Sequence, residues 1–283
     1  MSGSSPVTAP PSPSGTRPAG RPGGGAPRVV AVAFAAVGAL VLAGSCASAV
    51  AGTVDSAART DVLLTERAGG VTAVDVDVAG GGVRVVAGDG PEAELDVRST
   101  RGTWRLERDG GTLVVSSPPR SGVLQWRDQG TATLRLPAAL LDGRLDVGVD
   151  LAGGTLEVAA DLGALDVDVA GGSVELQGSV TALVADVTGG SLEADLVDVA
   201  TADVSLTAGS LEAVLDGTPP DAVVVDVEAG SVDLALPPAA YDVRADATAG
   251  SVDDGLRSSR TAPRTVDVTT TAGSVLLREV PEP

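Results

Sequence analysis

The chain has 283 residues, a formal net charge of −19, no histidine and, along the printed sequence, no lysine. Without these side chains the usual general bases and Schiff-base nucleophiles are missing, and the excess of acid opposes binding to a nucleic-acid backbone. Aromatic residues make up only 1% and hydrophobic residues 43%. The composition therefore predicts a non-enzymatic protein with no nucleic-acid partner and a core of many small aliphatic side chains.

The N-terminal part predicts a membrane anchor. Residues 1–28 are rich in Pro, Gly and Ser and contain arginines but no acid, as is typical of a disordered tail. Residues 29–54 contain no charged residue, and an uncharged segment of this length is long enough for a transmembrane helix or signal anchor. Arginines precede this segment and Asp55 follows it. The positive-inside rule then predicts a single-pass protein of the cell membrane, with a cytoplasmic N-terminus and an extracellular C-terminal domain.

Two processing alternatives compete with a retained anchor. Ala47-Ser48-Ala49 fits the small-residue pattern of a signal-peptidase site, and the segment ending at Cys46 loosely resembles a lipoprotein box, in which that cysteine is lipidated. A lipoprotein box usually has a large aliphatic residue three positions before the cysteine, where this chain has Ala43. All three alternatives export the rest of the chain, so they agree on where the C-terminal part acts.

After a short stalk, predicted at residues 55–70, hydrophobic and polar residues alternate with a period of two, which indicates strands. The pattern is irregular over residues 71–143, where we expect degenerate coils or hairpins that cap one end of the fold. This stretch holds Trp104 and Trp126, with several arginines nearby. Either the tryptophans close the end of the core, or together with the arginines they form a surface for glycan or anionic lipid headgroups.

Residues 144–280 repeat a short phrase of glycine followed by a hydroxyl residue, a hydrophobic residue and usually an acid. The hydroxyl residues recur at intervals of 18 to 23, at Thr155, Ser173, Ser191, Ser210, Ser231, Ser251 and Ser274. Such a period marks stacked coils. The sequence therefore predicts an all-β fold, a single-domain β-solenoid of about 18 to 23 residues per coil over residues 71–280, preceded by one transmembrane helix.

Aligning the coils on their hydroxyl residue predicts which side chains point inward. One inward column is Leu156, Val174, Leu192, Leu211, Val232, Val252 and Val275, and a second is Val158, Leu176, Ala194, Ala213 and Leu234. Asp254 interrupts the second column, which predicts a distorted coil there. Residues 265–280 restore the pattern, so we expect this last coil to end the stack, followed by prolines that discourage further pairing.

Acidic residues also recur in register with the coils. One set is Asp77, Asp150, Asp168, Asp186, Asp226 and Asp246, and the other is Glu157, Glu175, Glu193, Glu212, Asp233 and Asp253. In stacked coils these sets become ladders of like charge, which are either solvated or occupied by Ca²⁺. The candidate calcium ladder consists of Asp150, Asp168, Asp186, Glu157, Glu175 and Glu193; no catalytic residue, cofactor site or other metal site is predicted.

The glycine–hydroxyl coils, such as Gly171-Gly172-Ser173-Val174-Glu175-Leu176, behind a single hydrophobic segment resemble the bacterial putative-adhesin family. The resemblance covers about residues 71–280 and implies a β-helix-like cell-surface domain, with no catalytic residue to carry over. We therefore expect a non-enzymatic adhesin or envelope-associated protein that binds cell-wall glycan or a surface protein. An envelope-stress sensor or regulatory membrane protein is the alternative, and a polysaccharide lyase is a further one.

Overall fold

Strands form nearly all of the regular structure in the computed structural model, which describes residues 60–100, 102–118 and 130–281. Within these ranges the only helix is the short 3-10 helix η1 (Ala138–Leu140). The all-β prediction is thus confirmed. No helix among the described residues is both long enough and apolar enough to cross a membrane. The segment predicted to do so, residues 29–54, lies outside them.

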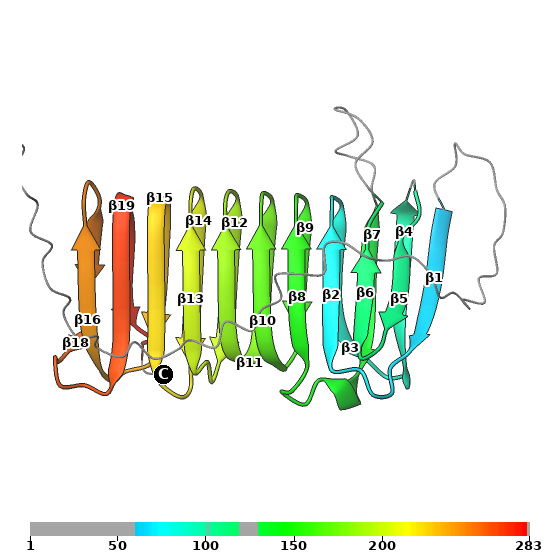
Figure 1. The fold of residues 1–283 in the computed structure, drawn as a ribbon, viewed down its shortest axis with the longest axis horizontal. Coiled ribbons are helices and arrows are strands. Elements are labelled where there is room, and N and C mark those ends of the chain that lie inside the picture. Colours follow the sequence, from blue (N-terminus) through cyan, green and yellow to red (C-terminus); the bar gives the residue numbers. More distant parts are fainter. Residues whose placement is uncertain (1–59, 101, 119–129, 282–283) are drawn as a thin grey trace, which may run out of the picture. The chain divides into compact units, whose positions relative to one another are not determined.

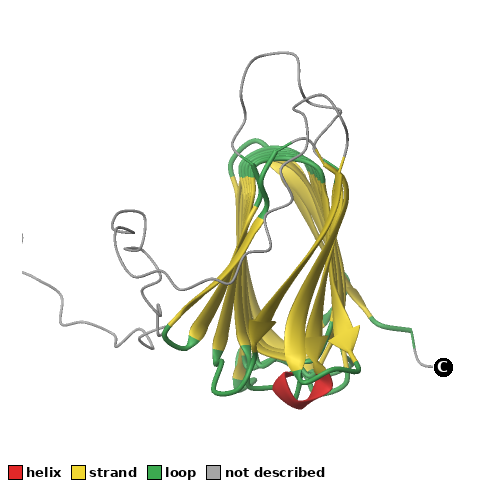
Figure 2. Ribbon diagram, turned by 90° about the vertical axis from the view of Figure 1, so that its right-hand side faces the viewer, coloured by secondary structure: helices red, strands yellow, loops and turns green. Residues whose placement is uncertain are grey.

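The strands lie in two facing layers (Figures 1 and 2). In spatial order the first layer contains β5 (Arg105–Asp109), β6 (Thr112–Ser116), β2 (Ala73–Val78), β8 (Asp146–Leu151), β10 (Leu162–Val169), the second half of β11 (Ser173–Val187), β13 (Thr201–Leu206), and the first halves of β15 (Ala222–Leu236) and β19 (Arg264–Glu279), then β16 (Ala240–Ala247). The very short β18 (Arg257–Ser258) pairs with β16.

The second layer faces the first across the core. In spatial order it contains β1 (Thr60–Arg67), β4 (Glu92–Thr100), β7 (Thr131–Pro137), β3 (Gly82–Gly88), β9 (Thr155–Ala159), the first half of β11, β12 (Ser191–Val197), β14 (Ser210–Asp216), the second halves of β15 and β19, and β17 (Ser251–Asp254). Pairing is antiparallel only where β1, β4 and β5 take part, and it is parallel between all other described strands.

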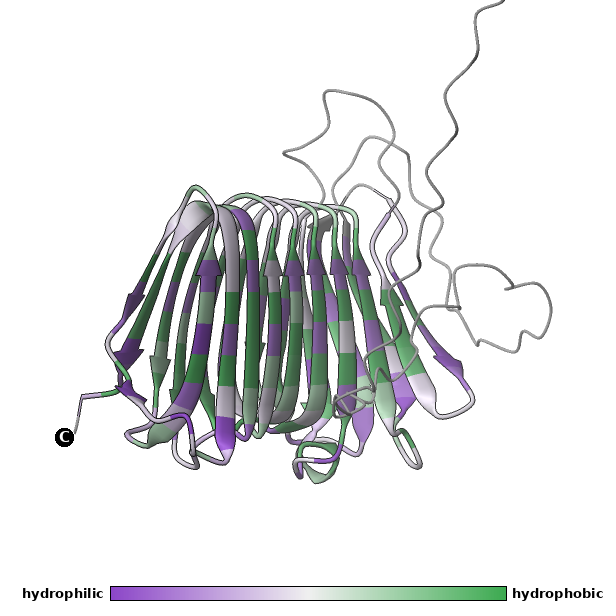
Figure 3. Ribbon diagram, turned by 60° about the vertical axis from the view of Figure 1, so that its left-hand side comes forward, coloured by the Kyte–Doolittle hydropathy of each residue, from purple (hydrophilic) through white to green (hydrophobic). Residues whose placement is uncertain are grey.

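One coil consists of a strand in each layer and a tight glycine corner between them. In β10 the residues Leu165, Val167 and Val169 are buried while the intervening aspartates face water, as the alternation predicts. The chain then turns at Gly172, whose φ of 110° suits glycine, and enters the other layer. Figure 3 shows the alternating hydropathy as bands that continue from strand to strand. All residues of the two predicted columns are buried except Val252, which is half-buried.

The coils do not stack in chain order. Numbered along the described chain, they are coil 1 (73–88), coil 2 (112–116 and 131–137), coil 3 (146–159), coil 4 (162–178), coil 5 (180–197), coil 6 (201–216), coil 7 (222–236), coil 8 (240–254) and coil 9 (264–279). The strand pairings place them in the order 2-1-3-4-5-6-7-9-8. At each end of the stack, two coils have therefore exchanged places (Figure 1).

The prediction that residues 265–280 end the stack is therefore wrong, because coil 9 lies between coils 7 and 8. The inward residues explain this order. Coil 8 has Ala245, Ala247 and Asp254 at inward positions, and all three are exposed at the end of the stack. Buried between two coils, the Asp254 carboxylate would lose its hydration. At the end, it instead accepts hydrogen bonds from the Leu256 N–H (3.0 Å) and the Ser258 hydroxyl (2.7 Å).

The irregular N-terminal part contains both alternatives expected for it. Coils 1 and 2 pair in parallel. At the end of the stack, β4 instead pairs antiparallel with β1 and β7, and β5 pairs antiparallel with β6, as in hairpins. Residues 60–67, inside the predicted stalk, form strand β1 because Val62 and Leu64 pack against the core. Trp104 is buried in the core. It therefore helps to close this end and is not part of an exposed aromatic surface; Trp126 lies outside the described residues.

Candidate functional site

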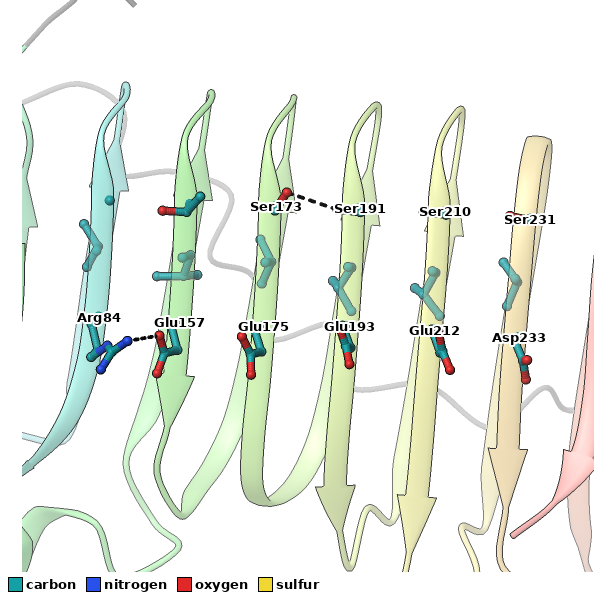
Figure 4. A pocket seen from close by; sticks show the side chains of 18 of the residues that line it. Arg84, Glu157, Ser173, Glu175, Ser191, Glu193, Ser210, Glu212, Ser231 and Asp233 are labelled. Carbon is teal, nitrogen blue, oxygen red and sulfur yellow. Dashed lines mark hydrogen bonds and ion pairs between the residues drawn. The ribbon is translucent and has the colours of Figure 1, made fainter. Parts of the chain in front are cut away.

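A groove of about 920 Å³ runs along the second layer, across the coils (Figure 4). The stacking brings the repeated hydroxyl residues into one row and the acids two positions later into another. In spatial order the hydroxyl row is Thr155, Ser173, Ser191, Ser210, Ser231 and Ser274, and the carboxylate row is Glu157, Glu175, Glu193, Glu212 and Asp233. We call this surface the hydroxyl–carboxylate groove.

Arginines lie at both ends of its carboxylate row. Arg84, which occupies the acid position of coil 1, forms an ion pair of 2.6 Å with Glu157. At the other end the Arg278 Nε donates to Asp233 (2.7 Å), and its guanidinium lies 3.9 Å from Glu212. Both pairs are partly exposed, so each contributes little to stability. They nevertheless neutralise the ends of the row and leave the negative charge concentrated at its centre.

The centre of the groove is formed by coils 4 and 5. Here Glu175 accepts a hydrogen bond from Gln177 (2.8 Å), and Ser191 donates its hydroxyl to that of Ser173 (3.1 Å). Among the described residues, Glu193 has no ion-pair partner within 4.0 Å. Adjacent rungs repeat at about 4.8 Å. The centre therefore presents hydroxyl groups, which donate and accept, beside carboxylates, which only accept.

A second set of acids lies on the outer face of the first layer. Its main row runs Asp77, Asp150, Asp168, Asp186, then Ser205 and Asp226. A parallel row two residues earlier has an aspartate in every second coil, at Asp75, Asp166, Asp203 and Asp267. The four consecutive aspartates line a hollow of about 450 Å³. We call this surface the aspartate face.

Crowding perturbs the acids of the aspartate face. Desolvation by partial burial, followed by repulsion from Asp150, raises the pKa of both Asp77 and Asp168 above its ordinary value of 3.8. Asp75, Asp166 and Asp203 have raised pKa values as well, again mainly because of desolvation and then because of neighbouring aspartates. The charged forms of these groups are therefore disfavoured in the folded protein.

The six residues of the predicted calcium ladder do not form one site. Asp150, Asp168 and Asp186 lie on the aspartate face, whereas Glu157, Glu175 and Glu193 line the groove on the opposite layer. Within the described ranges, no three acidic, histidine or cysteine side chains are arranged so that they could hold a metal ion. The two ladders are separate surfaces of different chemistry, one with hydroxyl groups beside its carboxylates and one dominated by crowded aspartates.

Sequence reasoning did not identify the arginines that end the groove. Arg84 stands two residues after Gly82, in the position that glutamate occupies in later coils, so aligning coil 1 with them would have found it. Arg278 contacts acids of coils 6 and 7 only because coil 9 lies next to coil 7. No sequence spacing gives that neighbour. The second row of the aspartate face was also missed, although it alternates regularly between coils.

No family model matches this chain, and no curated protein matches it either. Several solved structures are similar to it. One of a putative adhesin from Bacteroides fragilis is 12% identical, covers 78% of this chain and 97% of its own, and has a TM-score of 0.46. One of a putative cell adhesion protein from Clostridium sporogenes is 10% identical, covers 78% and 100%, and has a TM-score of 0.32. These descriptions name the kind of protein that the glycine–hydroxyl coils resemble.

Proposed function

We propose that residues 71–280 form a non-enzymatic, adhesin-like binding module of the cell surface, and that the module holds an extended glycan along the hydroxyl–carboxylate groove. The observation that carries the proposal is the groove itself. It crosses successive coils and presents the same pair of polar groups in each of coils 3 to 7. A surface that repeats along one axis suits a ligand that also repeats along one axis.

The chemistry of the groove favours a particular class of glycan. Carboxylates only accept hydrogen bonds, so they pair with sugar hydroxyls or with ammonium groups. The net charge of −19 opposes polymers rich in phosphate, sulfate or carboxylate. A neutral or amino-bearing cell-wall glycan therefore fits better than an anionic one. The regular repetition of the serines, in a chain without histidine or lysine, supports binding over nucleophilic catalysis.

The test compares two variants that remove the same charge from opposite layers. Glu193→Gln changes the centre of the groove, and Asp168→Asn changes the aspartate face. Binding of the full chain to neutral, amino-bearing and anionic glycans is measured by pull-down and titration calorimetry. We expect Glu193→Gln to weaken binding of a neutral or amino-bearing glycan by about tenfold, since a hydrogen bond to a charged group contributes about 1.5–3 kcal/mol.

Asp168→Asn should leave that affinity within about twofold, because surface charges more than a Debye length apart are largely screened at physiological salt. Equal losses in both variants would mean that only net charge matters, and the groove would then not be the binding site. Unchanged binding in Glu193→Gln, or a preference for anionic glycans, would also overturn the proposal.

The cell-surface location is part of the same proposal. It is supported by the uncharged segment 29–54, which follows an arginine-bearing tail and precedes the coils. Protease added to intact cells should then degrade the coils and spare the N-terminal tail. Protection of the coils until the cells are lysed would contradict an extracellular location.

A further inference from the structure

The last strand of the chain fills an internal position of the stack. β19 pairs with β15 over 14 residue pairs and, on its other edge, with β16 over seven and β17 over four. In Figure 1 it is the red strand between yellow β15 and orange β16. Coils 7 and 8, which are consecutive in the chain, are therefore joined in space only through β19. We call the position between them the β19 slot.

The side chains of β19 match an internal position. Val266, Val268, Val275 and Leu277 point into the core and are buried, with coil 7 on one side and coil 8 on the other. Coil 8 would not tolerate the same cover, because the Asp254 carboxylate at one of its inward positions would lose its hydration. Coil 8 is therefore suited to the end of the stack and β19 to its interior, whatever their order in the chain.

The backbone phrase that sets the register does not distinguish these coils. Ala-Gly-Ser-Val occurs at residues 229–232, 249–252 and 272–275. Ser231 pairs with Ser274, which in turn pairs with Ser251. The edge of coil 7 is thus complementary to any chain that carries this phrase with apolar inward residues. A second copy of the protein offers such a strand in its own β19.

The connection to β19 is suited to exchange. The segment from 255 to 263 is mostly exposed, with Leu256 as its one buried residue. An exposed ion pair, Arg257 Nε to Glu279 (2.9 Å), joins it to the end of β19. We call this segment, residues 255–263, the hinge, because it connects coil 8 to β19. In an exchanged dimer the pairings of β19 with β15, β16 and β17 are kept, and only the hinge, with its short strand β18, changes its conformation.

We propose that the β19 slot is a strand-binding site for a second copy of this chain, filled by the β19 of either copy. Reciprocal exchange gives a closed two-fold dimer, because each copy supplies one strand and one slot. The partner is recognised by parallel strand pairing along β15 and by burial of four aliphatic side chains. This inference does not rest on the proposed function, although β19 also contributes Ser274 and Arg278 to one end of the groove.

Disulfide trapping between different chains tests the exchange. Asp226 and Thr269 are direct neighbours on β15 and β19, on the layer opposite the groove. Neighbouring strands lie about 4.8 Å apart, within the roughly 4.4–6.8 Å that a disulfide requires. Full-length chains with Asp226→Cys and full-length chains with Thr269→Cys, both also Cys46→Ser, are unfolded together, refolded in detergent at high concentration and oxidised. We expect about half of the exchanged dimers to be cross-linked, as random pairing requires.

The matched control mixes Asp226→Cys chains with Ser205→Cys chains. Ser205 is the neighbour of Asp226 on the other side, in β13, which is not exchanged. This mixture should give only background dimer on a non-reducing gel. A double variant, Asp226→Cys with Thr269→Cys in one chain, should close its disulfide and so establish that these variants fold with β19 in place. If it closes while the first mixture gives no more dimer than the control, the slot accepts only its own strand and the proposal is wrong. Failure of the double variant to close would also overturn it, because β19 would not lie beside β15.

Discussion

The carbonyl oxygen of Gly154 lies where a β-carbon on Gly172, in the next coil, would have to stand. The same oxygen accepts a hydrogen bond from the Ser173 N–H at 3.0 Å. Corner glycines of successive coils thus approach each other closely, and Gly172 also has a φ of 110°. Glycine is required at this position both by the backbone conformation and by the neighbouring coil.

Replacing Gly172 by alanine should therefore destabilise the stack by about 2 kcal/mol or more, through an unfavourable φ and a backbone clash. The adjacent Gly171 is the matched control. A β-carbon there would lie 3.8 Å from its nearest neighbour, the Ala152 carbonyl oxygen, which is an ordinary van der Waals distance. Gly171→Ala should change stability by less than about 0.5 kcal/mol. The urea midpoints of the two variants measure the difference, and equal midpoints would contradict the close approach.

Val174→Asp tests the inward column. Val174 is 2% exposed and pairs with Leu156 and Leu192 on either side. An unpaired carboxylate at this position should lower stability by about 3 kcal/mol or more, because it is buried without a partner. Glu175→Gln, one residue later and facing outward, should change stability by less than about 0.5 kcal/mol. Thermal melting of both variants decides the matter, and an unaltered Val174→Asp protein would refute the inward assignment.

The aspartate face should make the protein more stable in mild acid than at neutral pH. A carboxyl whose pKa is raised in the folded state binds protons more tightly there than in the unfolded chain. The free energy of unfolding therefore increases as the pH falls through the raised pKa values of these groups toward 3.8, the ordinary pKa of an aspartate such as Asp168. No histidine titrates in this interval. The melting temperature, followed from pH 7 down to about 4, should rise.

Two aspartates separate this effect from acid effects in general. Asp168→Asn should raise the melting temperature at pH 7 and reduce its rise in acid. Asp198 has the opposite behaviour: hydrogen bonds from the Thr218 hydroxyl (2.7 Å) and N–H (2.9 Å) lower its pKa. Asp198→Asn should therefore lower stability at pH 7. If both variants changed the melting temperature in the same direction, the assignment of raised carboxyl pKa values to the aspartate face, through desolvation and then repulsion, would be wrong.

Tyr241, the only tyrosine, should control stability in alkali. It is fully buried and donates its hydroxyl to the Pro237 carbonyl (2.9 Å), and desolvation raises its pKa from 10.0 to about 12. A raised folded-state pKa means that stability is lost as the pH rises above the unfolded value of 10.0. The chain has no lysine to mask this titration.

Tyr241→Phe should cost about 1–2 kcal/mol at pH 7, because the buried carbonyl loses its donor. The same variant should lose less stability than the parent protein between pH 10.0 and about 12. Ultraviolet titration of the parent phenol gives an independent reading of the same pKa. A phenol that ionises near pH 10 in the folded protein would show that Tyr241 is not desolvated.

Much of the fold could be predicted from the sequence, because the features that determine it lie within short segments of the chain. Alternation in a segment such as residues 165–169 determines which side chains point inward, and the recurring glycine–hydroxyl phrase determines where each coil turns. The two inward columns and both acidic ladders follow from these two features alone. The two arginines that end the groove did not follow from these features, since Arg84 and Arg278 acquire their acidic partners only through the stacking of coils.

The order of the coils is what only the tertiary structure decided. Every coil carries nearly the same phrase, so the backbone pairing of coil 7 with coil 8 and with coil 9 is equally acceptable to the local sequence. The choice depends on which coil has to face water at the end of the stack, and that is a property of the whole assembly. Asp254 is tolerable only at the end, whereas Val268 and Leu277 gain most when they are covered on both sides. The sequence alone thus determined the form of each coil, while the competition between coils for the solvent-exposed ends determined their positions.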